Sequence, residues 1–226
     1  GVSALQSNTT GIYNTANGVS ALYYNTTGVQ NTASGLQALV NNTTGNNNTA
    51  LGFSAGSAIT TGSNNIAIGY NAQVPTASAS NQVRIGNATI SYAGIQVAWT
   101  ITSDKRWKSN IQESNLGLDF ITKIRPVSYV RSNDAAQKTE YGFIAQELEE
   151  ALNESGAGNN GMISKDDQGM YSLRYNDLLA PMVKAIQELS KQNKELTDRV
   201  AELEVMVKSL VSERGKTTSS KLSEVR

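Results

Sequence analysis

Residues 48–56 read NTALGFSAG, and residues 65–73, seventeen positions later, read NIAIGYNAQ. Both stretches place Asn, Ala, Gly and an aromatic residue at the same offsets. Five glycines carry the same spacing through the first third of the chain, at positions 1, 18, 35, 52 and 69, and an Ala follows each of them three positions later. A disordered segment has no reason to keep a period through five copies, so we predict a repeat structure.

Other columns of the repeat are equally regular. Asn occupies positions 14, 31, 48 and 65, and a Thr-Gly pair occupies 10–11, 27–28, 44–45 and 61–62. A unit of seventeen residues is too small to bury a face alone, whereas stacked units can, each contributing one coil of short strands. We therefore predict a β-roll or β-solenoid stalk over residues 1–75, with Asn and Thr forming hydrogen-bonded ladders along the stack. The chain begins on a repeat glycine with no capping segment, so we expect it to be the C-terminal piece of a longer fibre.

Charge is distributed very unevenly along the chain. Arg84 is the one charged residue in 1–102, and the other 37 of the 38 charged residues follow from Ser103 onward. The chain has no Cys and no His, which excludes disulfides, thiol catalysis and imidazole bases or metal ligands. The net charge is zero, and no apolar run approaches the ~20 residues of a membrane span. We expect no cofactor, no metal, no nucleic-acid partner and no membrane insertion.

The C-terminal part has the heptad pattern of a coiled coil. Apolar residues between Met182 and Leu210 alternate at steps of four and three, with Leu at every d position and one Asn, Asn193, at a. This pattern predicts a coiled coil over 182–214 and a flexible tail over 215–226. β-Branched residues at a with Leu at d favour two strands. The flanking positions include the small or apolar residues Ala185, Ser190, Met206 and Val211. They widen the seam and favour three strands, so both a dimer and a trimer stay open.

The remaining segments separate the repeats from the coiled coil. Residues 76–102 read as a linker with connecting strands, at 83–86 and within the apolar stretch 90–101. Residues 103–181 read as a mixed α+β domain. We expect helices at 115–123 and 145–152, strands at 127–130, 141–144 and 171–173, and the start of the long helix near Asn176.

Five motifs follow one another from Ser103 onward. They are SDKRWKSNI at 103–111, IRPVSY at 124–129, GFIAQEL at 142–148, YNDL at 175–178 and AIQEL at 185–189. Together they resemble the endosialidase-type intramolecular chaperone domain, the S74 peptidase family. The 17-residue repeats resemble the heads of trimeric autotransporter adhesins and the shafts of phage tail fibres.

The resemblance implies a homotrimer whose C-terminal domain helps the upstream fibre domains of the same chain, its folding client, to fold and trimerise. It also implies self-release by autoproteolysis. It places the chain in a phage virion tail fibre or on the bacterial cell surface, with a host or prey surface receptor as a further partner of the fibre. A second interpretation, from another class, is the uncleaved structural tip or stalk of a trimeric adhesive fibre with an inactive chaperone-like domain.

The resemblance assigns a Ser–Lys dyad, with Ser103 as nucleophile, Lys108 as base, and Thr102 and Asp104 as neighbours of the cut. The chain would then be a single-turnover self-cleaving serine endopeptidase. A Ser hydroxyl needs a base to take its proton, and a Lys amine can do so where burial lowers its pKa. Side chains five positions apart diverge in a regular strand or helix, so a turn between residues 103 and 108 is required.

Three further positions near the motifs have two interpretations each. Arg125 either clamps a carboxylate across a subunit boundary or forms a structural ion pair. Glu147 belongs to a solvated helix face rather than acting as a catalytic carboxylate. Residues 166–169, Asp-Asp-Gln-Gly, suggest a turn more than a calcium loop. Many relatives carry a His where this chain has Glu140 and Tyr141, so a role of that His is absent or replaced here.

Overall fold

The computed structural model describes residues 1–134, 136–158 and 160–223, with side chains as far as Ser212. The chain divides into two compact units. The first combines residues 1–103 with 128–141 and 164–172, and the second combines 104–127 and 142–163 with the C-terminal part from Leu173. Two segments that follow the repeats by many residues, 128–141 and 164–172, thus pack in the same unit as the repeats.

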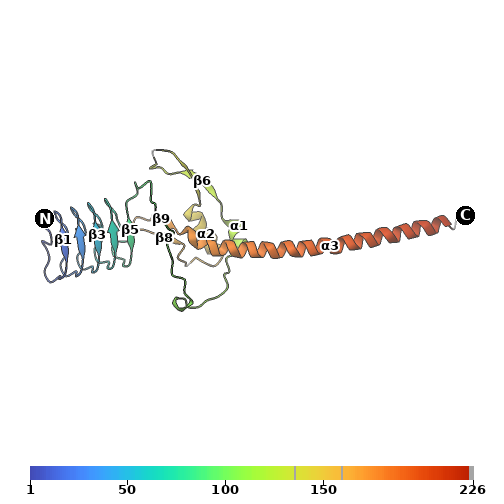
Figure 1. Ribbon diagram of the computed structural model, residues 1–226, viewed down its shortest axis with the longest axis horizontal. Coiled ribbons are helices and arrows are strands. Elements are labelled where there is room, and N and C mark those ends of the chain that lie inside the picture. Colours follow the sequence, from blue (N-terminus) through green and yellow to red (C-terminus); the bar gives the residue numbers. More distant parts are fainter. Residues whose placement is uncertain (135, 159, 224–226) are drawn as a thin grey trace. The chain divides into compact units, whose positions relative to one another are not determined.

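The repeats form one parallel sheet, with its strands stacked as successive coils of a β-solenoid (Figure 1). Each strand pairs with the next in a register of seventeen residues, so that Ala16 lies opposite Ala33, and Ala33 opposite Ala50. The strands are β1 (Thr15–Asn17), β2 (Thr32–Ser34), β3 (Thr49–Leu51), β4 (Ile66–Ile68) and β5 (Val83–Ile85). The predicted repeat architecture is confirmed. The fifth strand carries the sheet past Pro75 and lies where the sequence predicts a connecting strand, at 83–86.

Small residues build the narrow core of the solenoid. Its buried members are Ala21, Leu22, Ala33, Ala38, Leu39, Ala50, Ala55, Ile59, Ala67, Ala72 and Val74. Neighbouring coils approach so closely that a Cβ on Gly35 would collide with the carbonyl oxygen of Gly52. Gly35 also has a φ of +141°, a conformation that side chains disfavour. Close approach and backbone conformation together explain the glycine column of the repeat.

The predicted Asn ladder runs through this core and is fully hydrogen-bonded. The backbone N–H groups of Asn31, Asn48 and Asn65 donate to the side-chain oxygens of the Asn seventeen residues earlier, each at 2.9 Å. Gln82 ends the ladder, because its N–H donates to Asn65 Oδ1 at 2.9 Å. Buried amides are tolerated here because each finds partners in the adjacent coils.

The strand expected within 90–101 does not form. No strand lies between Gly86 and Ser103, all of which the structure describes. Ile95, Val97, Trp99 and Ile101 alternate along this segment and are all exposed. Alternation predicts a strand only where a second strand is available to pair with it.

The second unit is built around two short helices and the start of a long one. Its elements include η1 (Lys105–Trp107), α1 (Leu118–Lys123), α2 (Ala145–Glu154), η2 (Tyr175–Leu178) and α3 (Leu179–Ser223). Buried side chains from these helices and their approaches form its core: Leu116, Phe120, Leu148, Ala151, Leu152 and Leu178. Two antiparallel pairs complete the elements of the chain, β6 (Val127–Val130) with β7 (Thr139–Gly142), and β8 (Ile163–Lys165) with β9 (Tyr171–Leu173).

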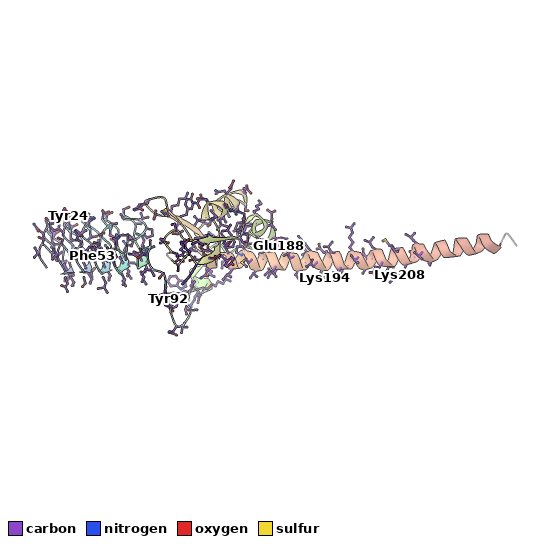
Figure 2. The ribbon with its side chains drawn as sticks, turned by 90° about the horizontal axis from the view of Figure 1, so that it is seen from above. Tyr24, Phe53, Tyr92, Glu188, Lys194 and Lys208 are labelled. Carbon is purple, nitrogen blue, oxygen red and sulfur yellow. The ribbon has the colours of Figure 1, made fainter. Side chains whose placement is uncertain are left out.

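A single helix, α3, carries the heptads. Its predicted seam residues are exposed in the single chain, with Ile186 at 63%, Leu196 at 61% and Leu203 at 52%. Lys194 and Lys208 project from the same helix (Figure 2). The backbone of 215–223, predicted as a flexible tail, is helical, and the last three tail residues, 224–226, lie outside the described residues. Among the described helices, none is apolar enough over a sufficient length to cross a membrane.

Candidate functional site

A tight turn follows Ser103 and ends at Lys108. Asp104 precedes η1 and accepts hydrogen bonds at its Oδ1 from the backbone N–H of Arg106 at 2.8 Å and from Arg106 Nε at 3.0 Å. These bonds hold the pKa of the Asp104 carboxyl below its ordinary value. The N–H of Lys108 closes the turn by donating to the carbonyl of Lys105 at 3.1 Å. The structure thus contains the irregular backbone that a Ser–Lys pair at this spacing requires.

The residues assigned to the cut lie at the surface of the single chain. Thr102, Ser103 and Lys108 are exposed, and Asp104 is half-buried. Trp107, inside the turn, is 82% exposed. Burial is one way to favour the neutral form of an amine, and Lys108 is exposed in the single chain.

Arg125 and Glu147 join two of the sequence motifs by a bidentate ion pair. Arg125 Nε donates to Glu147 Oε2 at 3.1 Å, and Arg125 Nη2 donates to Oε1. Hydrogen bonding to Arg125 holds the pKa of the Glu147 carboxyl below its ordinary value. Glu147 also lies in the first turn of α2, where the helix dipole favours a negative charge. Of the two interpretations of Arg125, the structure supports a structural ion pair within the chain.

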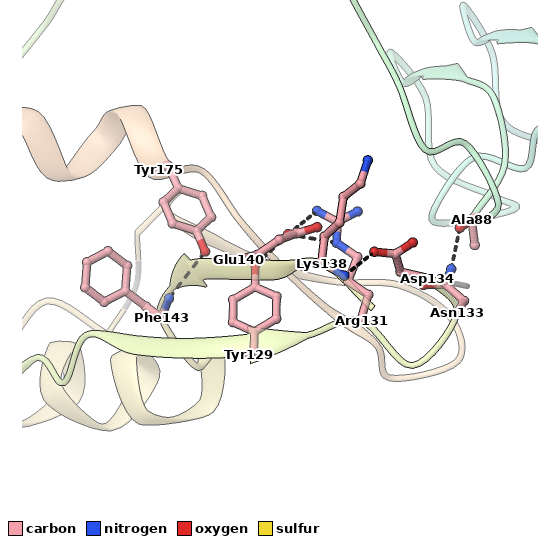
Figure 3. A network of polar contacts seen from close by, with 9 residues as sticks. All are labelled: Ala88, Tyr129, Arg131, Asn133, Asp134, Lys138, Glu140, Phe143 and Tyr175. Carbon is pink, nitrogen blue, oxygen red and sulfur yellow. Dashed lines mark hydrogen bonds and ion pairs between the residues drawn. The ribbon is translucent and has the colours of Figure 1, made fainter. Parts of the chain in front are cut away.

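Tyr175 connects two further motifs. Its hydroxyl accepts a hydrogen bond from the backbone N–H of Phe143 at 3.3 Å (Figure 3). The rings of Phe143 and Tyr175 lie 5.9 Å apart between centroids. The motifs at 142–148 and 175–178 therefore meet in the fold, although 32 residues separate the bonded pair.

Glu140, just before the GFIAQEL motif, is engaged with its own hairpin. Its Oε2 accepts hydrogen bonds from Arg131 Nε at 3.0 Å and from the Tyr129 hydroxyl at 3.2 Å (Figure 3). Coulombic attraction to Glu140 holds the pKa of Arg131 above its ordinary value. Glu140 thus orders the β6–β7 hairpin as a paired carboxylate.

A cavity of about 410 Å³ lies beside this hairpin in the first unit. Its wall includes segment 88–91 and the charged groups of Arg131, Asp134, Lys138 and Glu140. Asp134 accepts a hydrogen bond from the backbone N–H of Lys138 at 2.9 Å, and Arg131 forms an ion pair with Glu140. These polar groups of the wall therefore have partners within the wall itself. Such a lining gives no basis for assigning a ligand.

Glu188 has a role that sequence reasoning missed. Its Oε2 accepts the backbone N–H of Leu118, the first residue of α1, at 2.7 Å. Gly117, at the N-cap of α1, supplies no side chain to accept such a bond, and a Cβ at this position would collide with the Glu188 carboxylate. Glu188 lies within the AIQEL motif, but the motif alone does not show that its partner is a helix start seventy residues earlier.

Comparison with known proteins agrees with the motif resemblance. Residues 103–157 match the protein-family model described as chaperone of endosialidase, Peptidase_S74. The matched segment begins at Ser103 and includes the first three motifs. Searches of curated proteins and of solved structures found no match to the chain.

Proposed function

We propose that the C-terminal part of this chain is an intramolecular chaperone that assembles the preceding β-solenoid stalk as a homotrimer and then releases itself by cleavage near residue 103. The observation that carries the proposal is that the repeat stalk is followed in the same chain by the segment that matches the family model. A segment that matches the chaperone of endosialidase begins at Ser103, downstream of a 17-residue-repeat β-solenoid in the same chain whose last strand ends at Ile85. A phage tail fibre or a bacterial surface adhesin is the expected setting, and the fibre would carry any receptor contact.

Association of several chains would cover surfaces that are open in one chain. The heptad residues of α3 are exposed along its whole seam. The outer face of the sheet becomes apolar toward its C-terminal end, where exposed residues include Leu51, Ile66, Ile68, Val83 and Ile85. Burial of apolar surface is worth roughly 25 cal/mol per Å², so both surfaces favour association. The wide seam flanks support three chains, although the Asn at one a position is compatible with two.

Cleavage would follow Ser–Lys chemistry. The neutral amine of Lys108 takes the proton of the Ser103 hydroxyl, whose oxygen attacks the carbonyl carbon of a flanking peptide bond. The bond breaks as its nitrogen accepts a proton, and water hydrolyses the resulting ester. Because Ser103 and Lys108 are exposed in one chain, we propose that a neighbouring chain supplies the burial that favours the neutral amine, so that cleavage depends on assembly.

The uncleaved structural tip is the second candidate, and one observation favours it. Contacts inside the first unit join residues on both sides of the proposed cut, including the Asn133 side-chain amide with the Ala88 carbonyl at 2.6 Å. A chain held together in this way can serve as a permanent end of a fibre.

A denaturing gel with intact-mass measurement separates the two candidates. Freshly expressed chain that cleaves beside Ser103 yields pieces of about 102 and 124 residues, which add up to the 226 of the chain. A chain that stays at full length after folding and prolonged incubation supports the structural tip.

A further inference from the structure

One column of the repeat forms a one-way hydrogen-bond ladder along the solenoid. In this column, each backbone N–H donates to the carbonyl oxygen of the residue seventeen positions later. The bonds run from Thr9 to Thr26 at 2.9 Å, from Thr26 to Thr43 at 2.9 Å, from Thr43 to Thr60 at 2.8 Å and from Thr60 to Ala77 at 3.1 Å. The direction of the ladder leaves Ala77 with an N–H that points beyond the last coil.

A carboxylate from a distant part of the chain meets that N–H. The N–H of Ala77 donates to Asp167 Oδ2 at 2.7 Å, across ninety residues of sequence. The backbone N–H of Asp167 donates in turn to the carbonyl of Pro75 at 3.0 Å. The Ala77 bond is shorter than every other bond in the ladder, as expected for a charged acceptor.

The β8–β9 hairpin holds Asp167 at its tip in a defined turn. Asp166 Oδ1 accepts the backbone N–H groups of Gln168 at 2.9 Å and of Met170 at 2.8 Å, so it shapes the loop. Gly169 completes the turn with a φ of +78°, which glycine adopts without strain. Lys165 lies over the ring of Tyr171 at 4.3 Å from its centroid and ties the two strands together.

We infer that the β8–β9 hairpin is the cap of the solenoid, in which the Asp167 carboxylate takes the place of the carbonyl oxygen that a further coil would present. The open end of a stacked β-structure exposes unpaired N–H groups that invite pairing with another chain. Solenoids therefore need terminal segments unlike their repeats. Residues 163–173 supply one, and they lie beyond the segment 103–157 that matches the family model.

This cap goes beyond the proposed function, because it depends neither on cleavage nor on the number of chains. It also identifies a contact by which the part of the chain after residue 103 orders the end of the stalk. If the chain is cut near residue 103, the cap and the stalk become separate pieces that the Asp167 contacts still join.

Hydrogen–deuterium exchange on the full chain tests the cap. In Asp167→Ala, a peptide covering residues 74–80 should exchange about ten-fold faster or more, the effect of losing a charge-assisted bond. Asp167→Asn should keep most of the protection, because an amide oxygen still accepts. Asp198→Ala, which removes a carboxylate from an outward position of α3, serves as the control and should leave this peptide unchanged.

The hairpin peptide, residues 163–173, reports whether the turn itself survives. Unchanged exchange at 74–80 in Asp167→Ala overturns the cap. If Asp167→Ala also unfolds the hairpin, the exchange rates in Asp167→Asn decide whether Asp167 acts as the acceptor. Fast exchange at 74–80 with a protected hairpin in that variant overturns the acceptor role, and slow exchange supports it.

Discussion

Ile59 packs directly over the Cα of Gly56, where a Cβ would lie only 3.1 Å from Ile59 Cδ1. The two residues depart from the repeat together. The column of Gly56 holds Leu in the three preceding coils, and the column of Ile59 holds Asn. Ile59 is fully buried and fills space beside Leu39, whose Cδ2 would lie 3.0 Å from the same Cβ. The fourth coil thus exchanges a Leu–Asn pair for a Gly–Ile pair.

This exchange predicts strong coupling between positions 56 and 59. Ile59→Asn should destabilise the stalk by about 3 kcal/mol or more, because it removes buried apolar volume and adds an amide. Gly56→Leu should also destabilise it, since its side chain would meet Leu39 and Ile59. The double variant restores the pattern of the earlier coils and should recover at least about 1 kcal/mol relative to the sum of the single changes. Urea unfolding of the four chains measures this, and additive effects would show that the columns are independent.

The buried Asn ladder should be most sensitive at its centre. Asn48 is fully buried, donates to the Gly62 carbonyl at 2.8 Å and accepts the Asn65 N–H at 2.9 Å. Asn48→Ala should cost about 2–4 kcal/mol, because it leaves both backbone groups without partners. Asn14→Ala, at the half-buried start of the ladder, is the matched control and should cost less. Equal losses in thermal unfolding would argue against burial as the cause.

The Arg125–Glu147 pair should make stability depend on acid pH. Arg125 lowers the pKa of Glu147 in the folded chain, so the unfolded chain binds protons at Glu147 at a higher pH than the folded chain does. The pair therefore stabilises the fold above the ordinary Glu pKa near 4.5, and this contribution is lost as the pH falls through the lowered pKa. Because the pair is exposed, the effect should be small. The melting temperature of Glu147→Gln should fall less between pH 7 and pH 3 than that of the parent chain.

The proposed dyad predicts which single changes stop cleavage. Ser103→Ala and Lys108→Ala should each slow processing by at least about a thousand-fold, because one removes the nucleophile and the other its base. Ser109→Ala and Lys105→Ala change the same residue types within the same exposed segment and should process normally. Gel densitometry over time gives the rates. Wild-type rates in both dyad variants would exclude this pair.

The seam of α3 should control both assembly and cleavage. Leu203→Glu places a charge at a d position and should shift the mass in analytical ultracentrifugation from three chains to one. Val205→Glu, two residues along the helix at the outward f position, should leave the trimer intact. If assembly supplies the burial at Lys108, Leu203→Glu should also stay uncleaved. A monomeric variant that cleaves at the normal rate would show that the site is complete within one chain.

Sequence alone was sufficient for the features that local repetition specifies. The step of seventeen residues set the strand register from β1 to β4, and the Asn column predicted a ladder that the structure contains. The heptads located the long helix, and the motifs from Ser103 identified a segment that the family model also matches. Each of these signals is a pattern of neighbouring residues, which the chain carries whatever it folds against.

Only the tertiary structure decided the pairings between charged groups and distant partners. Arg125 with Glu147, Glu188 with Leu118 and Asp167 with Ala77 are separated by 22, 70 and 90 residues. The 37 charged residues after residue 102 allow many such pairs of similar intrinsic strength, and a bond forms only where the fold brings two groups within about 3 Å. The apolar stretch 90–101 shows the same limit of sequence-based prediction. Its alternation predicts a strand, but a strand forms only beside a partner strand, and the single chain pairs none with this stretch.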